Sequence, residues 1–202
     1  MIISAINLKG GAGKTTSIMA LATAAARDGF DATVYDADPQ SSASSWADVA
    51  EESGEPLPFE VLPANRTTIA KLARKLSGKP DKWAFIDCPP GGEVTDDARK
   101  ASDLVVVPSK TGPADLTKTT QVCSVLEHDN NAYVVAFTQV ATNTNSYAFA
   151  TSLAEENEWS CFKQPIPRRE SLQNQFGYPF EKNLYGYEAL WSAIKAGLAG
   201  EE

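Results

Sequence analysis

A lysine- and glycine-rich segment near the start of the chain has the residue types that bind phosphate. Residues 9–16 read Lys-Gly-Gly-Ala-Gly-Lys-Thr-Thr, a restricted form of the nucleotide-binding pattern G-x-x-x-x-G-K-[ST] with a lysine directly before its first glycine. Glycines let backbone N–H groups converge on an anion without Cβ clashes, and the start of a following helix adds partial positive charge. We therefore expect Lys14 to lie between the outer phosphates of a nucleotide and the Thr15 hydroxyl to bind Mg2+.

The residues on either side of this segment have the patterns of a strand and a helix, a context that distinguishes a phosphate-binding loop from a chance match. An apolar run spans residues 2–8, and residues 17–27 have a helical pattern. The alternative is an ordinary strand-to-helix turn, which does not account for a lysine and a threonine at these spacings. The expected nucleotide contacts in the segment are Lys9, Gly10, Gly11, Ala12, Gly13, Lys14, Thr15 and Thr16.

Two further apolar runs end in aspartates. Residues 34–40 read Val-Tyr-Asp-Ala-Asp-Pro-Gln and residues 84–90 read Ala-Phe-Ile-Asp-Cys-Pro-Pro. Parallel strands deliver such groups to the carboxyl edge of a sheet, where carboxylates suit Mg2+. Asp87 is expected to hold the water shell of the metal, and Asp38 to face the metal and orient an attacking water. The alternative, that these acids cap the following helices, stays open for Asp36.

Strand-like apolar runs alternate with helical patterns along the chain. Strands are expected at residues 2–7, 33–36, 59–62, 84–87, 104–108, 133–139 and 161–165, and helices at residues 17–27, 42–52, 67–76, 95–101, 116–126, 147–156 and 187–198. This alternation predicts an α/β fold, a three-layer sandwich with a mostly parallel central sheet. Because no linker or repeat interrupts the pattern, residues 1–202 are expected to form a single domain.

The composition argues against several classes of protein. Hydrophobic residues make up 43% of the chain and charged residues 22%, as in ordinary globular proteins, and no apolar run is long enough to cross a bilayer. The three cysteines are widely spaced without a C-x-x-C pair, so reduced, buried thiols are expected. The only histidine, His128, lies in a polar segment, which argues against a zinc site or a histidine triad. We expect a cytoplasmic protein without a signal peptide.

The net charge of −8 is unevenly distributed. Residues 31–60 contain acids and no lysine or arginine, whereas residues 66–82 contain six basic residues and one acid. We expect this basic run to form the solvated face of a helix rather than a DNA-binding surface. The overall acidity weakens a diffuse attraction to nucleic acid, although a local basic face still binds phosphates.

These segments together resemble the ParA/MinD family of deviant Walker A ATPases. Residues 9–16 resemble the family's signature, residues 36–40 its switch I segment, and residues 85–90 its Walker B and switch II segment. Residues 105–109 match a further strand of the family, and residues 165–179 resemble the region after its late strand. The resemblance covers almost the whole chain. It implies a P-loop NTPase fold and the use of ATP and Mg2+, most like the small partition ParA proteins.

The resemblance also implies a role for Lys9 in a dimer. In this family the signature lysine reaches across to the ATP of the partner subunit, an arginine-finger role worth roughly 10^3 to 10^5 in rate. ATP would then hold a face-to-face homodimer and hydrolysis would release it. Loops that carry Asp38 and residues 89–92 would sense the γ-phosphate. Pro167 and Arg168 are expected to contact the nucleotide.

Small family members imply nonspecific DNA binding by the ATP dimer, nucleoid association in that form, and a ParB-like centromere-binding or adaptor protein that stimulates hydrolysis. Because only one strand precedes the phosphate-binding segment, sequence-specific operator binding is not expected. The candidate phosphate contacts on DNA are Lys163, Arg168, Arg169, Lys182 and Lys195. Arg168 and Arg169 have the alternatives of pairing with acids or bordering the nucleotide pocket.

Other functions on the same fold remain as alternatives. A membrane-positioning role would need a basic amphipathic helix at the end of the chain, whereas residues 193–202 contain two glycines, one lysine and two terminal acids, so no membrane partner is expected. A dethiobiotin-synthetase-like metabolic enzyme would use ATP on a small molecule, and Lys9 with the switch I resemblance favours the dimeric switch instead. Positioning of another cargo, such as a protein assembly, stays open.

Overall fold

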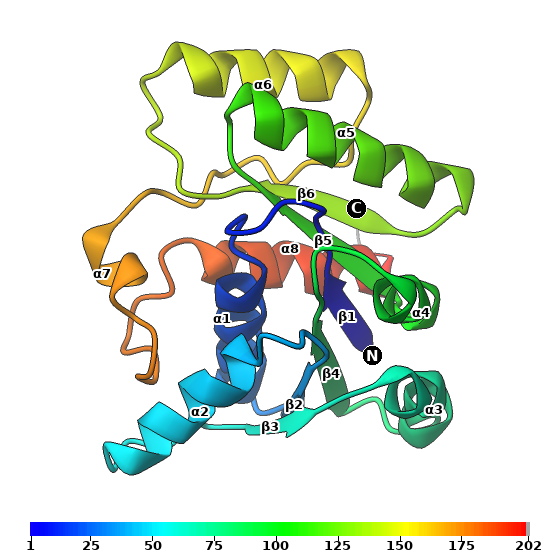
Figure 1. Ribbon diagram of the computed structural model, residues 1–202, viewed down its shortest axis with the longest axis vertical. Coiled ribbons are helices and arrows are strands. Elements are labelled where there is room, and N and C mark those ends of the chain that lie inside the picture. Colours follow the sequence, from blue (N-terminus) through cyan, green and yellow to red (C-terminus); the bar gives the residue numbers. More distant parts are fainter. Residues whose placement is uncertain (201–202) are drawn as a thin grey trace.

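The protein, described by a computed structural model over residues 1–200, contains one sheet of six parallel strands in the order β3-β2-β4-β1-β5-β6 (Figure 1). Residues 201–202, the last two of the predicted domain, lie outside the described residues. The strands are β1 (Ile2–Ala5), β2 (Asp31–Asp36), β3 (Glu60–Pro63), β4 (Lys82–Asp87), β5 (Leu104–Ser109) and β6 (Tyr133–Phe137). The prediction of a parallel α/β sheet is confirmed.

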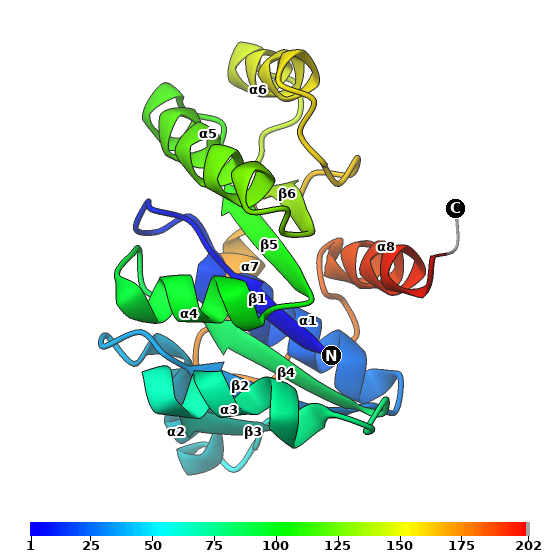
Figure 2. The same ribbon diagram turned by 90° about the vertical axis from the view of Figure 1, so that its right-hand side faces the viewer.

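Helices cover both faces of the sheet. They are α1 (Lys14–Arg27), α2 (Ser42–Glu52), α3 (Arg66–Leu76), α4 (Glu93–Ala101), α5 (Pro113–His128), α6 (Asn145–Glu156), α7 (Glu170–Gln173) and α8 (Tyr187–Ala199). Buried residues of α1, α2 and α8 form one core cluster, and those of α3, α4, α5 and α6 form a second. Figure 2 shows α1 and α8 on one side of the sheet and α4 and α5 on the other. The predicted three-layer sandwich is therefore confirmed.

Side chains of the central strand β1 pack against both layers of helices. Successive side chains of a strand point to opposite faces of the sheet. Ile3 and Ala5 accordingly belong to the core cluster of α1 and α8, whereas Ile2 and the following Ile6 belong to the cluster of α4 and α5. Every residue of β1 is buried, as expected for a parallel strand that is covered by helices on both faces.

Small residues let α1 lie closely against the sheet, and aromatic side chains fix α8 beside it. Ala20 and Ala22 on α1 are fully buried. At the other end of the same core, the rings of Trp83 and Trp191 lie 4.7 Å apart in an edge-on arrangement, and Phe30 lies 5.4 Å from Trp83. Burial of such side chains stabilises the fold by roughly 1.5–3 kcal/mol each. The packing holds the C-terminal helix on the same face as α1.

The prediction of a seventh strand at residues 161–165 is wrong. The segment runs along β6 but makes only isolated parallel bridges, such as that between Val135 and Cys161. Pro165 and Pro167 lack the N–H groups that a continuous ladder requires. The segment therefore borders the edge of the sheet without extending it.

Several element boundaries also differ from the prediction. Helix α1 begins at Lys14 rather than at residue 17, and α5 begins at Pro113 rather than at residue 116. Proline is favoured in a first helical turn because the N–H that it lacks would have no helical partner there. The short helix α7 was not predicted. Among residues 1–200, no helix combines the length and the apolar composition needed to cross a membrane.

The expectation that the basic run forms the solvated face of a helix is confirmed for the part of it that lies in α3. Helix α3 buries Ile69 and Leu72 against the sheet, while Lys71 and Arg74 on its opposite face are exposed. The cysteine expectation also largely holds, because all three thiols are free and only Cys161 is partly exposed.

Candidate functional site

The strand order opens a crevice at the carboxyl ends of β1 and β4. These strands are neighbours, with Ala5 opposite Asp87. The helix that follows β1 packs on one face of the sheet and the helix that follows β4 packs on the other, so the two connections diverge. Open α/β sheets bind ligands at such points of divergence. Residues 9–16, which we call the phosphate loop, leave β1 at this position.

Gly13 starts helix α1 in a backbone conformation that disfavours side chains. Its φ is +97°, and a Cβ there would lie 3.5 Å from Oγ1 of Thr138. The N–H of Ser17 donates to the Gly13 carbonyl at 2.9 Å, which begins the helical hydrogen-bond series. No side chain caps the N-terminus of α1. The first amides of the helix therefore remain available to an anion.

Two side chains that follow β6 hold the phosphate loop in place. Thr138 Oγ1 donates to the carbonyl of Ala12 at 2.8 Å, and Gln139 Nε2 donates to the carbonyl of Gly11 at 3.4 Å. Gln139 has a φ of +53°, in the left-handed region that non-glycine residues rarely adopt outside turns and strained functional sites. The sequence analysis did not identify either residue. The available signal was the polar Thr-Gln pair at the end of an apolar strand.

Lys14 is buried inside the curve of the phosphate loop. Only 7% of the residue is exposed, and its Nζ lies 3.5 Å from the carbonyl oxygen of Lys9. Burial lowers the pKa of Lys14, while the charges of Asp87 and Asp38 raise it. A buried ammonium group is stabilised by charge-assisted hydrogen bonds to an anion. The loop therefore presents a desolvated cation beside the open amides of α1.

Asp87 and Thr15 are joined by a hydrogen bond across the crevice. Thr15 Oγ1 donates to Oδ2 of Asp87 at 2.7 Å. Burial raises the pKa of Asp87 to about 7, although the hydrogen bond from Thr15 opposes this shift. The other carboxylate oxygen, Oδ1, is buried and has no hydrogen-bond partner within residues 1–200. A carboxylate oxygen with unmet bonding capacity next to a threonine hydroxyl fits a hydrated Mg2+ ion, which binds hard oxygen ligands.

Asp36 and Asp38 have different surroundings although they are two residues apart. Oδ2 of Asp36 accepts hydrogen bonds from the backbone N–H and the hydroxyl of Ser44, at 2.8 and 2.7 Å. Asp36 therefore caps the first turn of α2, which was the alternative left open for it. Asp38 instead is half-buried, accepts a hydrogen bond from the Gln40 N–H at 2.9 Å, and lines the same pocket as Lys14.

Two pockets at the phosphate loop share Gly13, Thr16 and Gln139 in their linings. The first, of about 400 Å³, contains the glycines of the loop together with Lys14, Thr15 and Asp38. The second, of about 310 Å³, is lined by residues that follow β6 and by α7 and α8; these include Thr138, Ile166, Pro167, Arg169, Leu172 and Tyr187. Each pocket is within the range of about 300–1,000 Å³ that is usual for small-molecule and cofactor sites.

Of the two nucleotide contacts predicted after β6, Pro167 lines a pocket and Arg168 does not. Pro167 lines the second pocket, as expected for a nucleotide contact. Arg168 is exposed and lies outside the linings of both pockets, whereas its neighbour Arg169 lines the second. Arg169 is therefore the arginine of this pair that borders the pocket.

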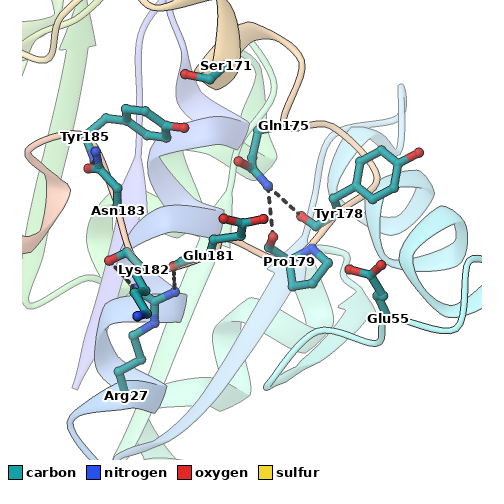
Figure 3. A pocket seen from close by; sticks show the side chains of 10 residues that line it. All are labelled: Arg27, Glu55, Ser171, Gln175, Tyr178, Pro179, Glu181, Lys182, Asn183 and Tyr185. Carbon is teal, nitrogen blue, oxygen red and sulfur yellow. Dashed lines mark hydrogen bonds between the residues drawn. The ribbon is translucent and has the colours of Figure 1, made fainter.

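The basic residues predicted to contact DNA do not form one patch. Lys182 lines a pocket of about 1280 Å³ that lies beside the C-terminal end of α1 (Figure 3). There the Arg27 guanidinium donates to backbone carbonyls of residues 180–182. Lys195 is ion-paired with Asp28, which directly follows α1. Since α1 has 14 residues and is about 20 Å long, Lys182 and Lys195 are far from the phosphate loop.

The remaining basic candidates follow β6. Lys163 lines an apolar groove between the sheet edge and α8, away from the phosphate loop. Arg168 and Arg169 are adjacent in the chain and both exposed. This arginine pair therefore lies beside the second pocket, apart from Lys182 and Lys195.

The residue directly before the phosphate loop departs from the nucleotide-binding pattern. The pattern G-x-x-x-x-G-K has a glycine five residues before Gly13, and this chain has Leu8 there. The chain therefore matches this pattern at Gly13, Lys14 and Thr15 but not at its first glycine. Leu8 is 39% exposed, and a Cβ on Gly91 would contact its side chain at 3.6 Å. An apolar side chain thus lies at the rim of the loop, next to Lys9.

Comparisons with known proteins agree with this geometry. The sequence model of the CobQ/CobB/MinD/ParA nucleotide-binding domain matches residues 3–177. Protein ParA from Rhizobium radiobacter is 24% identical over 220 residues, a match that covers 100% of this chain and 92% of that protein.

Solved structures share the fold at low sequence identity. The cell division ATPase MinD from Pyrococcus furiosus superposes with a TM-score of 0.76 at 20% identity, covering 96% of this chain and 98% of that one. A plasmid partition protein from Borrelia burgdorferi gives 0.75 at 16% identity, with 97% and 98% covered. Cobyrinic acid a,c-diamide synthase from Mycobacterium smegmatis, with bound ADP and magnesium, gives 0.75 at 19% identity, with 100% and 96% covered. With a family match over most of its length, the chain belongs to the CobQ/CobB/MinD/ParA family of nucleotide-binding domains.

Proposed function

We propose that this protein is an ATP-hydrolysing switch of DNA segregation that forms an ATP-dependent sandwich dimer. The observation that carries the proposal is the hydrogen bond from Thr15 to the buried carboxylate of Asp87, whose Oδ1 has no hydrogen-bond partner in the described chain, next to the buried ammonium of Lys14. This is the donor set that a triphosphate and its magnesium ion need.

Each residue of the first pocket has a distinct part in binding. The glycine amides and the start of α1 bind the phosphate oxygens, and Lys14 neutralises the β- and γ-phosphates. Thr15 and Asp87 would hold Mg2+, with Asp38 facing the same site. When bound, Mg2+ would supply positive charge that neutralises the phosphates. Pro167 and Arg169, with Arg168 close by in the chain, border the nucleotide in the second pocket.

Asp38 is proposed to orient the water that attacks the γ-phosphate. Its carboxylate is half-buried and lines the phosphate pocket, and its loop leads directly into α2. Hydrolysis of a phosphoanhydride depends mainly on positioning and charge neutralisation, so a carboxylate that fixes the water is sufficient chemistry. Loss of the γ-phosphate would then release this loop.

Lys9 is proposed to act across the dimer interface. Its side chain is half-buried, does not line the pocket of its own subunit, and makes no ion pair or hydrogen bond within residues 1–200. A free cation at the rim of a phosphate site is placed to neutralise a second triphosphate. Two such lysines, exchanged by two-fold symmetry, make dimerisation depend on ATP.

The proposed cargo is DNA, through nonspecific binding by the ATP dimer on the nucleoid in the cytoplasm. A ParB-like partner is proposed to stimulate hydrolysis. The relative named Protein ParA and the Borrelia burgdorferi plasmid partition protein support this choice. The similarity to cobyrinic acid a,c-diamide synthase keeps a metabolic enzyme as the second candidate, and Lys9 outside its own pocket favours the dimeric switch.

The direct test is sedimentation velocity of the full chain without nucleotide, with ADP, and with a nonhydrolysable ATP analogue plus Mg2+. A dimer only with the triphosphate supports the proposal, and Lys9→Gln should weaken that dimer without loss of ADP binding. A chain that stays monomeric with bound triphosphate, or that turns over ATP only with a small-molecule acceptor, would contradict the switch and favour the metabolic candidate.

A further inference from the structure

A second lysine lies against the phosphate loop and comes from a different strand. Lys110 directly follows β5, and its Nζ lies 3.7 Å from the position that a Cβ on Gly11 would occupy. The side chain is half-buried. Across the part of the chain that the structure describes, its ammonium group makes neither an ion pair nor a hydrogen bond. A cation held beside an anion-binding loop without a carboxylate partner is suited to an anionic ligand.

The three lysines at the loop, Lys9, Lys14 and Lys110, differ in their position relative to the phosphate pocket. Lys14 lines the phosphate pocket of its own subunit together with Gly11. Neither Lys9 nor Lys110 lines that pocket. Both are half-buried at the loop and outside this pocket, so they remain available to the triphosphate of a facing subunit in a sandwich dimer.

The backbone at Lys110 is fixed by hydrogen bonds inside the core. Ser109 Oγ donates to the Lys110 carbonyl at 2.9 Å and accepts from Thr119 Oγ1 at 2.6 Å. The N–H of Thr138, the residue that also holds the phosphate loop, donates to the Ser109 carbonyl at 2.8 Å. These contacts tie Lys110 and the loop to the same rigid set of strand ends. Because this backbone is already fixed, binding restricts only the side chain of Lys110.

We propose that Lys110 binds the triphosphate of the partner subunit, together with the partner-facing Lys9, in the ATP dimer. The inference rests on the proposed function, because it requires two subunits face to face. Two-fold symmetry gives each bound triphosphate one Lys110 from the opposite subunit. ADP lacks the outer phosphate and its charge, so the contact distinguishes the two nucleotides and adds to the ATP dependence of the dimer.

The test compares three variants of the full chain with the wild type. Lys110→Gln removes the charge, Lys110→Arg keeps it, and Lys118→Gln removes a charge on α5 whose Nζ contacts only Gln121 among the described residues. Sedimentation with a nonhydrolysable ATP analogue and Mg2+ measures dimer affinity, and a fluorescent ADP analogue measures monomer binding. Because the symmetric dimer loses two charge-assisted contacts, Lys110→Gln should weaken dimerisation by about tenfold or more. Its ADP affinity should stay unchanged, and the other two variants should dimerise like the wild type.

Each result separates this inference from the proposed function. A wild type that does not dimerise with the triphosphate analogue overturns both. A wild type that dimerises and a Lys110→Gln variant of equal dimer affinity overturn only the role of Lys110. Loss of ADP affinity in Lys110→Gln, restored by Lys110→Arg, would assign the lysine to its own subunit and overturn the partner-facing role.

Discussion

The hydroxyl of Thr15 donates a 2.7 Å hydrogen bond to the carboxylate of Asp87, a residue 72 positions further along the chain. This bond joins the first turn of α1 to the end of β4 at the divergence of their connections. It also orients the carboxylate so that its other oxygen stays without a partner among residues 1–200. The nucleotide site thus depends on one contact that neither segment makes alone.

Replacement of Asp87 by Asn should change how stability depends on pH. Burial raises the pKa of Asp87 to about 7, so the folded protein holds a proton here that the unfolded chain releases near its ordinary value of 3.8. The contribution of Asp87 to the free energy of unfolding is present in full below about pH 4 and is lost as the pH rises through about 7. We expect Asp87→Asn to stabilise the nucleotide-free protein at pH 8 by on the order of 2 kcal/mol. Urea unfolding at pH 5 and pH 8 would measure it.

The same substitution should weaken Mg2+-dependent nucleotide binding at pH 8, where the carboxylate is charged. Asp96→Asn, at an exposed position of α4, serves as a control for loss of one carboxylate. Equal slopes of stability against pH for Asp87→Asn and wild type would contradict a buried, raised-pKa carboxylate.

Lys14→Ala should abolish nucleotide binding. The phosphates would lose a buried cation, and charge-assisted contacts of this kind are worth about 1.5–3 kcal/mol each, so we expect a loss of at least about 100-fold in affinity. Titration with a fluorescent ATP analogue measures the change. Lys71→Ala on the exposed face of α3 removes the same charge elsewhere, and unchanged affinity in Lys14→Ala would reject the assignment of the loop.

Asp38→Ala should keep ATP binding and slow hydrolysis by about 100-fold, because a water that is no longer oriented reacts with low probability. The triphosphate dimer should then persist. Phosphate release and sedimentation after ATP addition are the measurements, with Asp48→Ala on the exposed side of α2 as the control. Normal turnover by Asp38→Ala would assign the positioning of water to another group.

Gly177→Ala should be strongly destabilising. Gly177 has a φ of +84°, and a Cβ there would overlap Cγ1 of Val49 on α2. Strain in the left-handed region and overpacking together cost about 3 kcal/mol. Gly54 has a φ of +78° with open space around it, so Gly54→Ala should cost only about 1 kcal/mol. Thermal or urea unfolding compares the two, and equal losses would remove the packing argument.

Arg168→Ala should reduce nonspecific DNA binding by the ATP dimer, because Arg168 is exposed and lies outside the linings of both pockets at the phosphate loop. The symmetric dimer loses one phosphate contact per subunit, which lowers the slope of log affinity against log salt by about 2. Binding measured across a salt series gives this slope. The matched change Arg74→Ala lies on the exposed face of α3, and an equal effect there would indicate diffuse attraction instead of a local contact.

The core elements and the phosphate loop were predictable because their signals are local. The apolar runs of the six strands and the loop of residues 9–16 depend on neighbours within a few positions. The prediction of a seventh strand at residues 161–165 was wrong because it rested on the apolar pattern alone. That pattern does not take into account that Pro165 and Pro167 lack the N–H groups that a ladder needs. Asp36 stayed undecided because an acid after a strand can cap a helix or face a ligand, and only the position of Ser44 distinguishes them.

The sequence by itself determined the alternation of strands and helices, the phosphate loop and the aspartates that end β2 and β4, because each depends on short-range order along the chain. Only the tertiary structure decided that Asp87 contacts Thr15, that Thr138 and Gln139 hold the loop, and that Lys110 lies beside Gly11. The strand order 3-2-4-1-5-6 brings these distant residues together at one edge of the sheet. That order follows from how helices pack on both faces, a property of the whole chain that no local pattern contains.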